Sequence, residues 1–140
     1  MQVHGSCISR NGIGVLLLGP SGCGKSDLVL RLLECGFVLV ADDRVNIDGK
    51  TASAPAMLAG LLEVRGLGIL KIPYEAATQL ALIAELGNRS ERLPMPQTHP
   101  EFGLPVVQVD AASASAPVRI IYALDCALGR IEQVAGSFRI

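Results

Sequence analysis

Residues 19–26 form the stretch of this sequence whose composition and spacing have the clearest chemical meaning. They follow the pattern G-x-x-x-x-G-K-S/T of loops that bind nucleotide phosphates. The loop consists of Gly19, Pro20, Ser21, Gly22, Cys23, Gly24, Lys25 and Ser26. An apolar run, GVLLLG, precedes it, and apolar residues at helical spacing follow it, which is the strand–loop–helix context that the motif requires.

The chemistry of this phosphate loop (residues 19–26) follows from its residue types. Glycines let the backbone amides turn inward as an anion nest at the start of a helix. Lys25 adds a positive charge for the β- and γ-phosphates, and the Ser26 hydroxyl suits Mg²⁺. We therefore predict a site for ATP and Mg²⁺. A chance glycine turn is disfavoured because eight positions and both flanking elements agree.

Two adjacent carboxylates, Asp42 and Asp43, end the apolar run of residues 37–41. A phosphate-loop site needs an acidic residue at the end of a second strand for the metal, and kinases also need a base for the attacking hydroxyl. Successive residues of an extended strand point to opposite sides, so both face the nucleotide only if the backbone turns there. The alternative is a solvated strand end with Asp43 paired to Arg44.

Composition restricts the function classes further. The chain has 140 residues, enough for one domain with its own core, and 18% of them are charged, with a net charge of −1. This balance gives no basic footprint for nucleic acid. With neither a membrane-spanning run nor a signal peptide pattern, the default expectation is a cytoplasmic protein. Four irregularly spaced cysteines predict reduced, mostly buried thiols rather than a disulfide framework or a zinc site.

Periodicity and turn residues predict the elements that position these groups. Hairpins are expected around Asn11-Gly12 and Asp48-Gly49, a helix from the phosphate loop to Gly36, and a strand over residues 37–41. The remaining predictions are a short helix starting near Pro55, a shaped loop over 63–70, a helix over 74–86, a loop over 94–105, and strands over 106–109 and 118–124.

Several blocks in order resemble the catalytic domain of HPr kinase/phosphorylase: His4-Gly5, GPSGCGKS, LVADDRV and, above all, LLEVRGLGIL at residues 61–70. The resemblance implies an α/β fold, a P-loop kinase domain with a mixed sheet of the phosphoenolpyruvate carboxykinase-like kind. It also implies that residues 1–140 are one catalytic domain, in a short form lacking the N-terminal domain of longer members.

The resemblance further implies an ATP-dependent protein kinase that phosphorylates a serine of HPr or a related phosphocarrier protein. By motif position, Asp43 is the proton acceptor, with His4 and Lys25 in the active site. Ser26 and Glu63 contact Mg²⁺ with Asp42 nearby, and Arg92 matches the family's later catalytic arginine. Without the resemblance, the other readings are a structural His4, a surface ion pair between Glu63 and Arg65, and a solvated Arg92.

The chain departs from the family pattern in residues 110–115, DAASAS, where members carry a segment with glycine and arginine. Arginine supplies bidentate phosphate contacts that alanine and serine lack, so weak reverse phosphorolysis is expected. The resemblance also implies a homo-oligomer, a hexamer in the family. The alternatives are a small-molecule P-loop kinase and a non-catalytic ATP-binding sensor.

Overall fold

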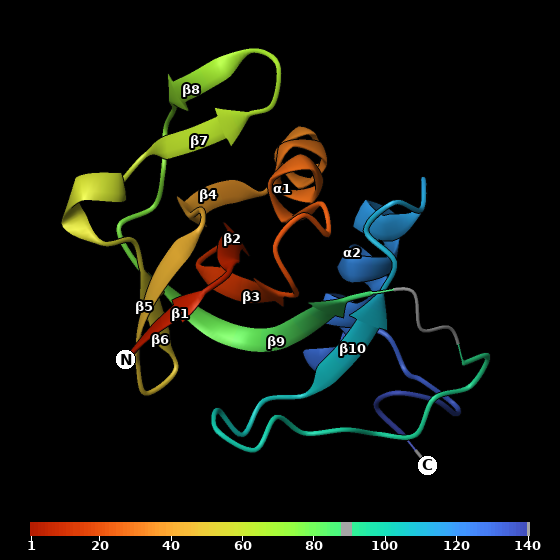
Figure 1. Cartoon of the computed structure of the whole chain (residues 1–140). Helices are drawn as coiled ribbons and strands as arrows, with labels where there is room; N and C mark the ends of the chain where they lie inside the picture. The colour runs from red at the N-terminus through yellow and green to blue at the C-terminus, as the bar shows by residue number, and fades with distance from the viewer. Residues whose placement is uncertain (88–90, 140) are drawn as a thin grey trace.

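A mixed eight-stranded sheet is the centre of the structure, a computed structural model that describes residues 1–87 and 91–139 (Figure 1). Its strands follow the order β1-β5-β6-β9-β3-β2-β4, and β10 also pairs with β9. The strands are β1 (Gln2–His4), β2 (Ser6–Arg10), β3 (Ile13–Leu18), β4 (Val38–Ala41), β5 (Arg44–Asp48), β6 (Thr51–Ser53), β9 (Thr78–Leu86) and β10 (Val106–Val109). The prediction of an α/β fold with a mixed sheet is confirmed.

Two helices and a separate hairpin complete the described elements. They are α1 (Lys25–Glu34), α2 (Ala116–Ala127), the short 3₁₀ helix Ala56–Leu58, and the two-stranded sheet β7 (Leu61–Val64) with β8 (Gly68–Lys71). Figure 1 shows α1 and α2 on one face of the large sheet, with the β7–β8 hairpin beside α1. No helix in the described part of the chain is both long and apolar enough to cross a membrane.

The core lies on both faces of the sheet, which explains the continuous apolar run in β3. Val15 and Leu17 pack in one cluster with residues of both helices, while Leu16 packs in a second cluster on the other side. β3, β9 and β10 run parallel, and strands buried on both faces are typical of parallel sheets. Their carboxyl ends therefore meet at one edge of the sheet, where β3 leads into the phosphate loop.

The predicted hairpins and the first helix are confirmed. β2 and β3 pair with Arg10 opposite Ile13, and Asn11 and Gly12 both take positive φ, 54° and 77°, as a type I′ turn requires. β5 and β6 pair around the turn after Asp48, and α1 ends before Gly36. The strand expected before the paired carboxylates is β4, and residues 106–109 form β10.

Two predictions of element type are wrong. Residues 74–86 were expected to form a helix from their alanines and leucines, yet Thr78–Leu86 is the longest strand of the sheet. Leu82 packs in the core cluster under the helices and Ile83 in the opposite one, so burial between β3 and its other neighbours overrides helix propensity. Conversely, residues 118–124 were expected to be a strand and lie in α2, where Ile120 and Leu124, four residues apart, are buried together.

Three further expectations need correction. Residues 63–70 are not a shaped loop but most of the β7–β8 hairpin, which closes with a backbone hydrogen bond from Leu67 to Val64 of 2.9 Å. The helix expected from Pro55 is limited to the 3₁₀ turn Ala56–Leu58. All four cysteines are free thiols as predicted, but only Cys7 is buried, and Cys35 is exposed.

Candidate active site

The phosphate loop joins β3 to α1, and its backbone has the shape that its glycines allow. Gly22 and Gly24 adopt φ of 80° and 97°, values that side-chain-bearing residues rarely take. Gly24 is the N-cap of α1 and supplies no side-chain cap, so the first amides of the helix are left for a ligand. At the other end, a Cβ on Gly19 would lie 2.8 Å from the Cys23 sulfur and 3.1 Å from the Leu86 carbonyl oxygen, so a larger residue there would force its neighbours to shift.

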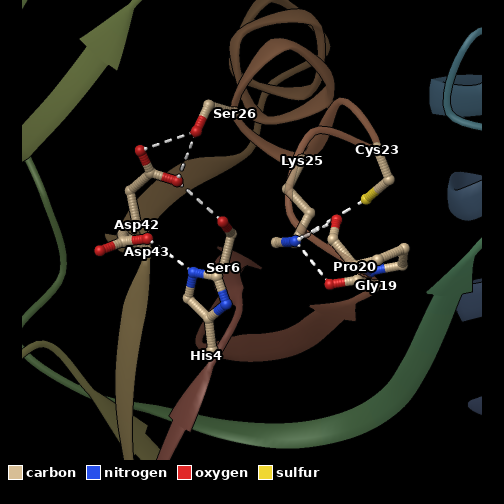
Figure 2. Close-up of polar contacts among 9 residues, drawn as sticks. All are labelled: His4, Ser6, Gly19, Pro20, Cys23, Lys25, Ser26, Asp42 and Asp43. Carbon is tan, nitrogen blue, oxygen red and sulfur yellow. Dashed lines mark hydrogen bonds and ion pairs between the residues drawn. The ribbon is translucent and has the colours of Figure 1, made fainter.

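Lys25 lies across this loop with its side chain largely buried. Its Nζ donates hydrogen bonds to the carbonyl oxygens of Gly19 at 2.6 Å and Pro20 at 3.1 Å, and lies 3.7 Å from the Cys23 sulfur (Figure 2). The ammonium group is therefore held against the loop by neutral acceptors. Phosphate oxygens are stronger acceptors for an ammonium group than these carbonyls, so the arrangement suits an anion.

Asp42 is buried at the end of β4 and accepts hydrogen bonds from two serines. The Ser26 hydroxyl lies 3.1 and 3.0 Å from its two carboxylate oxygens, and the Ser6 hydroxyl donates to Oδ1 at 2.8 Å. Serine hydroxyl and carboxylate oxygens are ligands that Mg²⁺ prefers. The pair formed by Ser26 and Asp42, beside the phosphate loop, thus has oxygens of the kind that Mg²⁺ prefers, and its assignment to the metal stays a prediction.

Ser6 is a member of this network that sequence reasoning missed. It is completely buried as the first residue of β2, two residues after His4. The only signal in the sequence is a serine two residues after His4 in the mixed stretch SCISR, and many such serines have no role. Its importance depends on the pairing of β2 with β4, which brings Cys7 opposite Ala41 and Ser6 next to Asp42.

The backbone turns at Asp43, which takes the positive φ of 72°. The Arg44 amide bonds to the Asp42 carbonyl at 2.9 Å, which closes a tight turn between β4 and β5. This turn breaks the strict alternation of an extended strand and lets both carboxylates reach the same end of the sheet, as Figure 2 shows. Asp42 and Asp43 can serve one site only if the backbone turns between them, and the structure has this turn.

Asp43 pairs with His4 rather than with Arg44. Nε2 of His4 lies 2.8 Å from Oδ1 of Asp43, and the Gly5 amide donates to the Asp43 carbonyl at 3.2 Å. The side chain of Asp43 is 63% exposed, so solvent and a substrate can reach it. The alternative reading, an ion pair between Asp43 and its neighbour, is therefore wrong. The imidazole orients a carboxylate that stands at the rim of the site.

Glu63 and Arg92 do not join this cluster. Glu63 is exposed on β7, and the described residues contain no group of three or more His, Cys, Asp or Glu side chains that could hold a metal ion. Of the three predicted metal ligands, Ser26, Asp42 and Glu63, the structure therefore brings together only Ser26 and Asp42. Arg92 is exposed after β9, and within residues 1–87 and 91–139 it forms no hydrogen bond or ion pair with the cluster.

These groups together offer three chemical functions in a small space. The phosphate loop and Lys25 present amides and a positive charge to an anion. Ser26 and Asp42 present oxygens to a divalent cation, and Asp43 with His4 presents a solvent-accessible carboxylate to a proton donor. This combination is what enzymatic phosphoryl transfer requires.

Comparisons with known proteins give the family. The family model described as the HPr Serine kinase C-terminal domain matches residues 1–87. HPr kinase/phosphorylase 1 of Oceanobacillus iheyensis is 34% identical over 134 residues, which cover 84% of this chain and 42% of that protein. HPr kinase/phosphorylase of Burkholderia lata is 43% identical over 124 residues, 76% of this chain and 38% of that protein. The enzyme of Clostridium tetani is 47% identical over 76 residues, 51% of this chain and 25% of that protein.

A solved structure has the same fold. The Hpr(Ser) kinase/phosphatase from Coxiella burnetii superimposes with a TM-score of 0.79 at 21% identity, covering 95% of this chain and 99% of that one. The chain spans well under half the length of the curated relatives described above. Because the family model matches more than half of its residues, the chain belongs to the family of the HPr serine kinase C-terminal domain.

Proposed function

We propose that this chain carries the phosphoryl-transfer site of an ATP-dependent protein serine kinase whose substrate is HPr or a related phosphocarrier protein. The observation that carries the proposal is the position of two carboxylates beside the phosphate loop. Asp42 is bonded to Ser26 of the loop, and Asp43 is bonded to His4 at the rim. Membership of the family supports HPr as the acceptor.

The residues divide the reaction between them. The amides of the phosphate loop and Lys25 bind the β- and γ-phosphates of ATP. Ser26 and Asp42 would hold Mg²⁺, which would neutralise charge on the transferring phosphates. The acceptor serine oxygen forms a bond to the γ-phosphorus while the bond from that phosphorus to the bridging oxygen breaks and ADP leaves. Asp43 takes the proton of the serine hydroxyl, and His4 orients Asp43.

Glu63 and Arg92 belong to this proposal as peripheral contributors. Both side chains are exposed and charged, and family resemblance assigns Glu63 to the metal and makes Arg92 a catalytic arginine. Glu63→Gln should weaken the Mg²⁺ dependence of transfer, and Arg92→Ala should slow transfer. A homo-oligomer, hexameric by resemblance, is a further proposal, and light scattering tests it. Weak reverse phosphorolysis is another, and it is tested by incubating phosphorylated HPr with inorganic phosphate.

The decisive experiment compares Asp43→Asn with the wild type. Loss of a general base lowers the rate by about 10²–10⁴-fold, so transfer to the HPr serine should fall by that factor while Mg-ATP binding stays within about twofold. Asp48→Asn is the matched control, because Asp48 is an exposed carboxylate at the far end of the adjacent strand β5. Unchanged transfer by Asp43→Asn removes Asp43 as the base.

The wild-type protein separates the alternative functions. A protein that binds Mg-ATP but transfers phosphate to no acceptor is a nucleotide sensor. One that turns over ATP with a metabolite but not with HPr is a small-molecule kinase. Either result refutes the assignment of HPr as substrate.

A further inference from the structure

A cavity of about 580 Å³ lies at the carboxyl end of β10, beyond the groups assigned to phosphoryl transfer. One wall is the proline-rich segment of residues 94–97, and the other is the connection from β10 into the first turn of α2. The lining includes Met95, Gln97, Gln108, Asp110, Ser113 and Arg119. A volume of this size is typical of sites for small organic ligands.

A segment that lines the cavity also packs against the phosphate loop. Ala111 lies between the lining residues Asp110 and Ser113, and a Cβ on Gly24 would lie 3.5 Å from the Cβ of Ala111. Arg31 of α1 holds the same segment in place with hydrogen bonds to the carbonyl oxygens of Ala111 and Ser113. The phosphate loop and the segment of residues 110–113 at the cavity are therefore direct neighbours in the structure.

The sheet topology explains why a single ligand would span both. β3, β9 and β10 are parallel neighbours, with Leu18 of β3 opposite Glu85 and Val109 of β10 opposite Leu86. Ligands of open α/β sheets lie across the carboxyl ends of such strands. A ligand whose phosphates occupy the loop after β3 thus extends naturally over the ends of β9 and β10, which is where the cavity opens.

The lining suits a nucleoside better than a second phosphate group. Among the described lining residues, Glu91 and Asp110 supply two carboxylates and Arg119 supplies one guanidinium, a balance that does not favour a second phosphate group. The Gln108 amide nitrogen donates to Glu85 at 2.9 Å, which orients that amide, and Arg119 is oriented by a 2.8 Å bond from Nε to the Ser115 hydroxyl. Fixed polar groups beside apolar methionine and proline surface are what a purine with its ribose requires.

We propose that this cavity holds the base and ribose of the nucleotide whose phosphates bind residues 19–26. The inference rests on the proposed function, since it takes the phosphate loop to be the nucleotide site. It adds the residues that distinguish a nucleotide from an inorganic polyphosphate. The cavity walls come from segments 91–97 and 108–119, outside the part of the chain that matches the family model.

The test measures two ligands by calorimetry with Mg²⁺ present: a non-hydrolysable ATP analogue, which has a nucleoside, and inorganic tripolyphosphate, which has none. Gln97→Trp fills the cavity, while Thr98→Trp is the matched control, since Thr98 is an exposed neighbour that does not line the cavity. Gln97→Trp should weaken analogue binding by about tenfold or more and change tripolyphosphate binding by less than about twofold. Thr98→Trp should change neither.

A second filling variant, Met95→Trp, guards against a local folding defect. The proposal is overturned if neither Gln97→Trp nor Met95→Trp weakens the analogue more than tripolyphosphate, or if Thr98→Trp does so equally. Failure of the proposed function looks different, because the wild type would then bind neither ligand, or Lys25→Ala would bind both as tightly as the wild type.

Discussion

Two buried serines on β2 provide a direct test of the network around Asp42. Ser6 and Ser9 are both completely buried, and they lie three residues apart on the same strand. The Ser6 hydroxyl donates to the Asp42 carboxylate at 2.8 Å, whereas the Ser9 hydroxyl has no hydrogen-bond partner among the described residues. The same substitution by alanine therefore removes a charge-assisted hydrogen bond at one position and an unsatisfied polar group at the other.

Ser6→Ala is expected to lower the free energy of unfolding, whereas Ser9→Ala is expected to leave it unchanged or raise it. A hydrogen bond to a charged group contributes about 1.5–3 kcal/mol to stability. Asp42 keeps its contact with Ser26 when Ser6 is replaced, so Ser6→Ala should destabilise by about 1.5–2 kcal/mol, the lower part of that range. Ser9→Ala loses only the desolvated hydroxyl, so it should be neutral or stabilise by up to about 1 kcal/mol.

Urea unfolding of the two variants and the wild type measures the difference. With a slope of about 2 kcal/mol per molar urea, Ser6→Ala should lower the midpoint by about 0.8–1 M, while Ser9→Ala should leave it unchanged or raise it. Ser6→Ala should also weaken Mg-ATP binding, because Asp42 loses one of the groups that orient it. Equal destabilisation by both variants would show that packing, not the bond to Asp42, sets the cost, and would refute the reasoning.

Three other predictions follow from the conformations and burial already described. Gly24→Ala and Gly49→Ala both force a side chain into positive φ at a cost of about 1–2 kcal/mol, but only Gly24→Ala should also weaken nucleotide binding, as measured by calorimetry. Burial raises the pKa of the Cys7 thiol, so alkylation followed by mass spectrometry should modify exposed Cys35 and spare Cys7 until the protein unfolds. Leu82→Ala should destabilise by about 2–5 kcal/mol in thermal or urea unfolding, because Leu82 is fully buried in the central strand β9.

The parts of the fold that were predicted correctly are those determined by a few neighbouring residues. Asn11-Gly12 dictates a type I′ turn and hence the β2–β3 hairpin, and the phosphate loop fixes the strand before it and the helix after it. Each of these signals depends on backbone conformations that few residue types adopt. These local structures therefore depend little on contacts with the rest of the chain.

The predictions that failed concern segments whose structure is decided by distant partners. Residues 74–86 have the composition of a helix, but β9 pairs with β3, β6 and β10, three strands from different parts of the sequence. Residues 118–124 contain β-branched residues typical of strands, yet α2 begins with Pro117 in its first turn and buries Ile120 and Leu124 against the sheet. The difference between helix and strand propensity in these segments is smaller than the free energy gained by burying their apolar side chains.

The site shows the same division between local and distant information. Asp42 and Asp43 were identified from their place after an apolar run, and the structure brings them to the phosphate loop. Their different surroundings were not readable, because Ser6 reaches Asp42, and His4 reaches Asp43, only through strand pairing across more than thirty residues. A buried carboxylate held by two hydroxyls stays in place beside a cation, whereas an exposed one held by an imidazole remains accessible to a substrate proton. The metal role of Asp42 and the proton-accepting role of Asp43 therefore depend on these different partners. The adjacency of the two residues in the sequence does not determine which role each one takes.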